Sequence, residues 1–76
     1  MVLSFVYDKL RNRIREKYGK QAALAYEIGM SEHTISEKLT GKKFFTQGEI
    51  IRICKKLDIP AMEIGEYFFT PKVQTN

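Results

Sequence analysis

Residues 21–41, QAALAYEIGMSEHTISEKLTG, decide the fold, because two short amphipathic segments meet there at a single glycine. Ala25 lies one helical turn before Gly29, a residue that adopts a left-handed backbone at little cost. Ser31 follows closely and can accept a hydrogen bond from the open amides at the start of a second helix. One helix is therefore predicted to end at Gly29 and another to begin shortly after it. This pattern is typical of a helix-turn-helix, in which the second helix protrudes.

The rest of the chain predicts three further helices around this motif. Gly19 ends the first helix, and Gly41 closes the third as a left-handed cap. Thr46 and Glu49 form a T-x-x-E capping box for the fourth helix, in which apolar residues recur at helical spacing as far as Asp58. The sequence therefore predicts an all-α domain with helices at about residues 7–18, 21–27, 32–40, 46–58 and 60–66. Side chains expected to face the core include Tyr7, Leu10, Ile14 and Met62, with Ile64 or Tyr67 beside the last.

Both ends of the chain are rich in strand-forming residues. Residues 2–7 and 67–70 could pair as a short β-ribbon, within one chain or between two chains, and an extended tail is the alternative. Three consecutive aromatic residues exposed to water are unusual for a monomer, so either packing or a partner should cover them. We expect one domain over residues 1–76, with its core at about 7–66 and a C-terminal tail at 67–76.

The net charge of +4 arises near the N-terminus, because residues 8–20 carry six basic and two acidic groups while the stretches on either side balance. On its own, such an excess is most simply a solvated helix face. Beside a helix-turn-helix it is also consistent with a polyanionic partner.

The single cysteine, Cys54, lies among apolar residues of the predicted fourth helix and is expected to be a buried, reduced thiol. The opening residues lack the pattern of a signal peptide, and no apolar run approaches the roughly 20 residues that span a bilayer. These features predict a cytoplasmic protein without membrane partners.

No reaction centre is recognisable in the sequence. His33 is the only histidine, with no cysteine or second histidine near enough to complete a metal site. A catalytic pair would need a nucleophile that is not apparent, and no glycine loop is suited to phosphates. We therefore expect no enzyme activity, no cofactor, no metal and no small-molecule substrate.

The central motif resembles the lambda-repressor-like family of DNA-binding proteins, also known as the xenobiotic-response-element or Cro type. The matching residues are Gln21, Leu24, Ala25, Ile28, Gly29, Ile35, Gly41 and Lys42. The resemblance implies a compact five-helix bundle over roughly residues 10–66. One departure is that Lys38 occupies the last apolar position of the motif, where Leu39 is expected to take over the packing.

The resemblance also implies that the helix at about 32–40 enters the major groove of DNA. The predicted base contacts are Glu32, His33, Thr34, Ser36 and Glu37. Because carboxylates are repelled by a polyanion, most of the affinity must come from phosphate contacts. These contacts are predicted at Lys20, Gln21, Ser31, Lys38, Lys42 and Lys43.

The resulting hypothesis is a sequence-specific transcriptional regulator of phage or prophage type, a repressor or Cro-like protein that binds a double-stranded DNA operator as a homodimer. Of Phe44 and Phe45, one is expected to pack beneath its loop and the other could face the second subunit. The alternative is a protein-interaction module, such as an antirepressor or adaptor, that presents Glu32, Glu37 and the aromatic C-terminus to another protein.

Overall fold

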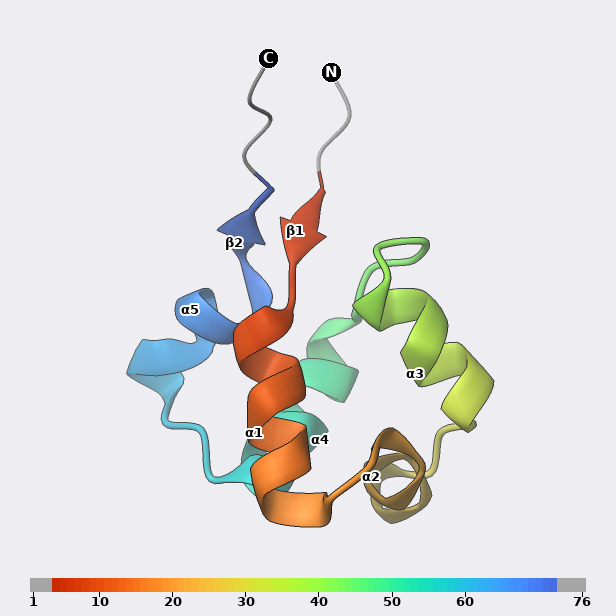
Figure 1. Ribbon diagram of the computed structural model, residues 1–76. Helices are drawn as coiled ribbons and strands as arrows, with labels where there is room; N and C mark the ends of the chain where they lie inside the picture. The colour runs from red at the N-terminus through yellow and green to blue at the C-terminus, as the bar shows by residue number, and fades with distance from the viewer. Residues whose placement is uncertain (1–3, 73–76) are drawn as a thin grey trace.

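The computed structural model describes residues 4–72, in which five α-helices surround one core and the two described ends lie side by side (Figure 1). The elements in chain order are β1 (Phe5–Val6), α1 (Asp8–Tyr18), α2 (Gln21–Ile28), α3 (Glu32–Leu39), α4 (Gln47–Leu57), the 3-10 helix η1 (Ala61–Glu63), α5 (Ile64–Phe68) and β2 (Thr70–Pro71). The predicted all-α class is confirmed. No helix among these residues is long and apolar enough to cross a membrane.

The corner between α2 and α3 forms as its residues predict. Gly29 has a φ of 73°, in the left-handed region, and the amide of Met30 reaches back to the carbonyl of Ala25 at 2.9 Å. Ser31 then caps α3, because its hydroxyl oxygen accepts the amide of Thr34 at 3.0 Å. One helix therefore ends, and the next begins, within three residues of chain outside either helix.

The core draws on all five helices. Six large side chains are almost completely buried, namely Leu10, Leu24, Ile35, Ile53, Leu57 and Phe68. The predicted inward positions of Tyr7 and Ile14 on the first helical segment are confirmed, and Leu39 is buried as expected. Cys54 is buried as well, and burial raises the pKa of its thiol. A buried thiol with a raised pKa is poorly suited to nucleophilic chemistry.

Helix α4 has well-defined ends. The predicted capping box is present, since Thr46 accepts the amide of Glu49 at 3.2 Å and donates its own amide to the Glu49 carboxylate at 2.8 Å. At the other end Asp58 adopts a left-handed φ of 55°, and the amide of Ile59 bonds to the carbonyl of Cys54. The chain then turns toward Pro60 without a glycine.

The terminal ribbon forms within one chain. Strand β1 pairs antiparallel with β2, with Phe5 opposite Pro71 and Val6 opposite Thr70. The ribbon is shorter than the strand-forming stretches suggested, because Tyr67 and Phe68 are helical and insert their side chains into the core. Residues 2–3 of the predicted strand and 73–76 of the predicted tail lie outside the described residues.

The prediction that Met62 turns toward the core is wrong. Its side chain is 91% exposed, because the segment after Pro60 starts as a 3-10 helix rather than as the first turn of α5. Ile64 and Tyr67, which were expected beside Met62, supply the apolar contacts of this segment.

Candidate recognition surface

Helix α3 lies at one side of the bundle, with one face turned away from the other elements (Figure 1). Glu32 and His33 are exposed at its N-terminal end, while Ser36 and Glu37 are half-buried one turn later. Thr34 is also half-buried, and its hydroxyl accepts a hydrogen bond from that of Ser31 at 2.7 Å. All five predicted base-contact residues therefore have some exposure on the N-terminal part of this helix.

Glu37 is the charged centre of this face. Its carboxylate lies 3.7 Å from Nε2 of His33 and 3.5 Å from Nζ of Lys43. Its side chain is 22% exposed, so part of it is accessible to solvent. A negative charge held beside the ammonium group of Lys43 meets less repulsion from nearby phosphates than an isolated carboxylate does.

A basic hollow of about 360 Å³ separates α3 from α1. Its lining residues are Arg11, Ile14, Arg15, Gly19, Lys20, Gln21 and Glu32. It includes the start of α2, where Lys20 is the N-cap residue and forms no side-chain hydrogen bond to the helix amides. The unpaired amides at the start of α2 and the cations around the hollow are suited to bind an anionic oxygen atom, such as that of a phosphate. The structure thus brings the predicted residues Lys20 and Gln21 together with Glu32.

Arg15 is a residue that the sequence-based set of phosphate contacts missed. It lines the basic hollow and is exposed, with Nη1 donating to Asn12 at 3.2 Å. Arg11 lines the same hollow but donates to the carbonyl of Leu39 at 2.8 Å, so its guanidinium also helps to hold the end of α3. The basic stretch 8–20 contains both Arg11 and Arg15 and indicated an excess of positive charge there. Helical spacing alone did not show which of its cations face α3.

Lys38 must be removed from the predicted phosphate contacts. It is 7% exposed, and its ammonium group forms an ion pair with Glu49 of α4. A group already paired in the interior cannot reach a phosphate without breaking that pair. Lys38 therefore joins α3 to the capping box of α4, which explains how a lysine is accommodated at an apolar position of the motif.

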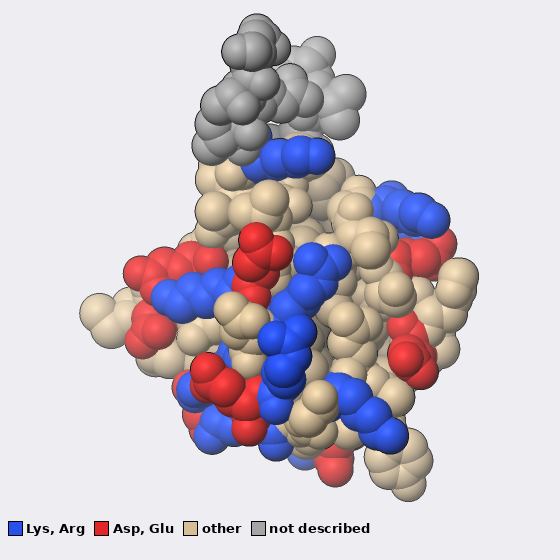
Figure 2. Space-filling view, viewed as in Figure 1, with Lys and Arg blue, Asp and Glu red and all other residues tan. Residues whose placement is uncertain are grey.

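The loop after α3 carries the remaining predicted cations. Gly41 has a φ of 87°, and Lys42 and Lys43 follow it with exposed side chains. Figure 2 shows a column of Lys and Arg side chains over α1 and acidic side chains along the edge formed by α3. The acidic face of α3 is thus bordered by positive charge from the basic hollow and from this loop.

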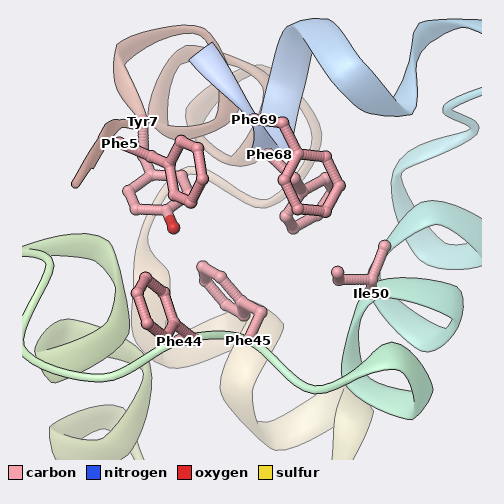
Figure 3. Close-up of a pocket in the computed structure, with 7 residues that line it drawn as sticks. All are labelled: Phe5, Tyr7, Phe44, Phe45, Ile50, Phe68 and Phe69. Carbon is pink, nitrogen blue, oxygen red and sulfur yellow. The ribbon is translucent and has the colours of Figure 1, made fainter. Parts of the chain in front are cut away.

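A second surface, which we call the aromatic groove, lies where the terminal ribbon approaches the loop before α4 (Figure 3). It is lined by Phe5, Tyr7, Phe44, Phe45, Ile50, Phe68 and Phe69. Phe45 packs edge-on against Tyr7 and Phe68, with ring centroids 5.4 Å apart in both cases. Of Phe44 and Phe45, Phe45 is therefore the one that packs beneath the loop, as one of the two was expected to do. Phe44 instead remains 58% exposed beside Phe5. The role of Phe44 in a dimer contact stays a prediction.

The chain belongs to the family described as "Protein of unknown function (DUF739)", whose model matches residues 3–71. Among solved structures it is similar to the solution structure of the modulator of repression (MOR) of the temperate bacteriophage TP901-1 from Lactococcus lactis. The two share 37% sequence identity with a TM-score of 0.78, over 93% of this chain and 96% of that one. No curated protein matches the chain.

These matches agree with the prediction of a small helical phage regulatory protein. Membership of the lambda-repressor-like family stays a prediction. Among residues 4–72, no group of three or more His, Cys, Asp or Glu side chains is arranged to hold a metal ion.

Proposed function

We propose that the protein is a phage regulator of repression that binds double-stranded DNA in a sequence-specific manner through α3. The observation that carries this proposal is the arrangement of charge around α3. Polar side chains project from its N-terminal part, and cations lie on both sides, in the basic hollow and on the loop after the helix. The similarity to a protein named a modulator of repression supports a role in the regulation of phage repression.

In this arrangement the side chains of α3 read base edges. Glu32 and Glu37 can accept from the amino group of cytosine, and His33 can donate to the acceptors of guanine. The hydroxyl of Ser36 can donate or accept, and the methyl group of Thr34 can contact thymine. The nearby cations allow both carboxylates to approach the DNA, because Glu32 shares the basic hollow and Glu37 lies beside Lys43.

The phosphate contacts come from residues on either side of the helix. Lys20, Gln21 and Ser31 belong to the helix-turn-helix itself, and Lys42 and Lys43 follow it. To these the structure adds Arg15 as a candidate. Two copies bound as a homodimer on a near-palindromic operator would place two α3 helices in major grooves about 34 Å apart.

A second candidate function, a protein-interaction module that acts as an antirepressor or adaptor, is favoured by one specific observation. With Lys38 buried against Glu49, the ionisable groups of α3 that are at least partly exposed are two carboxylates and one histidine. An acidic helix face bordered by cations can bind a basic protein surface as well as DNA. The name of the similar phage protein is compatible with either mode.

The deciding experiment is selection of bound duplexes from a randomised DNA pool, repeated across a salt series. We expect an enriched inverted repeat whose binding is abolished at moderate salt by Lys42→Glu with Lys43→Glu. The matched control is Lys55→Glu with Lys56→Glu, which makes the same charge change at exposed positions of α4. If no sequence is enriched even at low salt, the DNA-binding proposal fails. Loss of a regulatory partner on Glu32→Lys with Glu37→Lys would then support the protein-interaction module.

A further inference from the structure

The aromatic groove leaves large apolar side chains exposed to solvent. Phe44 is 58% and Phe69 50% exposed, although both have other aromatic rings within contact distance. A second apolar hollow continues the groove along α4, because Ile50 and Phe69 line both and Ile51 is 54% exposed beside them. Contiguous exposed apolar surface of this kind marks interaction sites on small soluble domains.

The size of the groove indicates what it can accept. Its hollow has a volume of about 210 Å³, and the apolar hollow that continues it along α4 has about 260 Å³. Figure 3 shows the rings of Phe44 and Phe45 opposite those of Phe5, Tyr7, Phe68 and Phe69. Phe45 contacts Tyr7 and Phe68, so the hollow is the space that remains among these side chains and Ile50. Such a space is suited to one or two apolar side chains that project from another polypeptide.

The charge beside the groove is predominantly positive. Lys42 and Lys43 directly precede Phe44 in the loop, and Lys72 lines a hollow that shares Phe5 and Tyr7 with the groove. Neither Lys42 nor Lys72 forms an ion pair with a carboxylate among residues 4–72, and Lys43 lies 3.5 Å from Glu37. The acidic residue lining these hollows is Asp8, which lies 3.7 Å from Arg11.

We propose that the aromatic groove is a docking site for another protein, which inserts apolar side chains flanked by acidic residues. Charge complementarity favours this occupant over a second copy of the chain. In a symmetric pair, groove against groove, each copy would bring the same positively charged rim of Lys42, Lys43 and Lys72 to the interface, where like charges repel.

This docking site shares the loop at Lys42 and Lys43 with the proposed phosphate contacts. A partner seated on Phe44 would cover both lysines and compete with DNA for them. That competition rests on the proposed function, whereas docking itself does not, so the two can be tested apart.

The test is selection from a library of randomised 12-residue peptides on the full chain, without DNA, with counter-selection on Phe44→Ala. We expect enriched peptides to combine Leu, Ile, Phe or Trp with Asp or Glu. Titration of a labelled enriched peptide should show binding at least about tenfold weaker with Phe44→Ala or with Phe69→Ala. Charge reversal by Lys42→Glu with Lys43→Glu should weaken it to a similar degree. The control is Met62→Ala, which removes a side chain that is 91% exposed outside the groove and should leave binding unchanged.

Three results would overturn the proposal. The first is the absence of any peptide whose enrichment depends on Phe44. The second is enrichment of apolar peptides with no acidic bias, or with a basic one. The third is a dimer, seen by sedimentation, that dissociates on Phe44→Ala, since a second copy would then fill the groove. Circular dichroism of each variant confirms that it is folded, and agreement between Phe44→Ala and Phe69→Ala guards against a local distortion.

Discussion

Lys38 and Glu49 form an ion pair that joins the proposed recognition helix to the start of α4. The same carboxylate oxygen of Glu49 bonds to the ammonium group of Lys38 and to the amide of Thr46, so the ion pair and the capping box share one atom. The side chains are 9% and 12% exposed. The position of α3 relative to α4 thus depends on one carboxylate.

Replacing Glu49 should therefore cost more stability than replacing Lys38. Glu49→Ala leaves a buried ammonium group unpaired and removes half of the capping box, and we expect it to lower the free energy of unfolding by about 3 kcal/mol. Lys38→Met keeps the amide of Thr46 on Glu49 and adds an apolar side chain, so we expect a loss of about 1 kcal/mol or less. Urea unfolding of both variants measures the difference. Equal losses would show that the shared carboxylate has no special role.

The same carboxylate predicts acid sensitivity. Burial by itself raises the pKa of Glu49, but hydrogen bonds from Lys38 and from Thr46 outweigh it, so the pKa is lowered overall. Because the folded state holds its proton less tightly than the unfolded state, this contribution is present above about pH 4.3, the ordinary pKa of glutamate. It is lost as the pH falls through the lowered pKa. Unfolding measured from pH 6 to pH 3 should show a smaller decrease in stability for Glu49→Gln than for the unsubstituted chain.

Asp58 provides the comparison for this titration. A hydrogen bond from Lys17 and the attraction of its charge lower the pKa of Asp58, which lies at the surface. Asp58→Asn keeps a residue that tolerates the left-handed backbone at this position. We expect it to alter the acid sensitivity less than Glu49→Gln does, because solvent screens the exposed pair. The reverse order would contradict the assignment to Glu49.

A substitution at the corner of the helix-turn-helix should destabilise the domain through backbone strain rather than through a steric clash. A Cβ atom added at Gly29 would meet no atom within 4 Å, but its φ of 73° is costly for other residues. Gly29→Ala should therefore destabilise the domain by about 1–2 kcal/mol. Gly48→Ala is the matched control, since its Cβ is also unobstructed and it lies within α4 with no positive φ. We expect that control to be neutral or stabilising by up to about 1 kcal/mol, measured by thermal unfolding.

Local signals were sufficient to predict most of the fold. Glycines at the ends of helices, the hydroxyl of Ser31 and the capping box at Thr46 act within a few residues, so their consequences can be inferred from the chain alone. The register of the terminal ribbon depends on how distant segments pack, and the exposure of Met62 follows from the 3-10 helix after Pro60, which the sequence did not predict. Helical rather than extended backbone at Tyr67 and Phe68 follows from their burial, which overrides the strand preference of aromatic residues.

The candidate site was less predictable for the same reason. Exposure of Glu32 and His33 follows from their place on the turn-facing end of α3, whereas the burial of Lys38 depends on Glu49, which lies eleven residues away on another helix. Arg15 joins the site only because α1 packs beside the start of α2. Sequence spacing can show which residues share one helix face, but the arrangement of the helices decides which faces meet.

The salt dependence of DNA binding tests the corrected set of phosphate contacts. If each subunit neutralises about three to five phosphates, the logarithm of affinity should fall with the logarithm of salt concentration at a slope of about −3 to −4.5. Lys42→Ala with Lys43→Ala should reduce the magnitude of this slope by about 2 per subunit. Lys38→Met should leave the slope unchanged, because that ammonium group is already paired with Glu49. Fluorescence anisotropy on a selected operator, from about 50 to 200 mM salt, measures all three slopes. A reduced slope for Lys38→Met would mean that the buried pair opens when DNA binds.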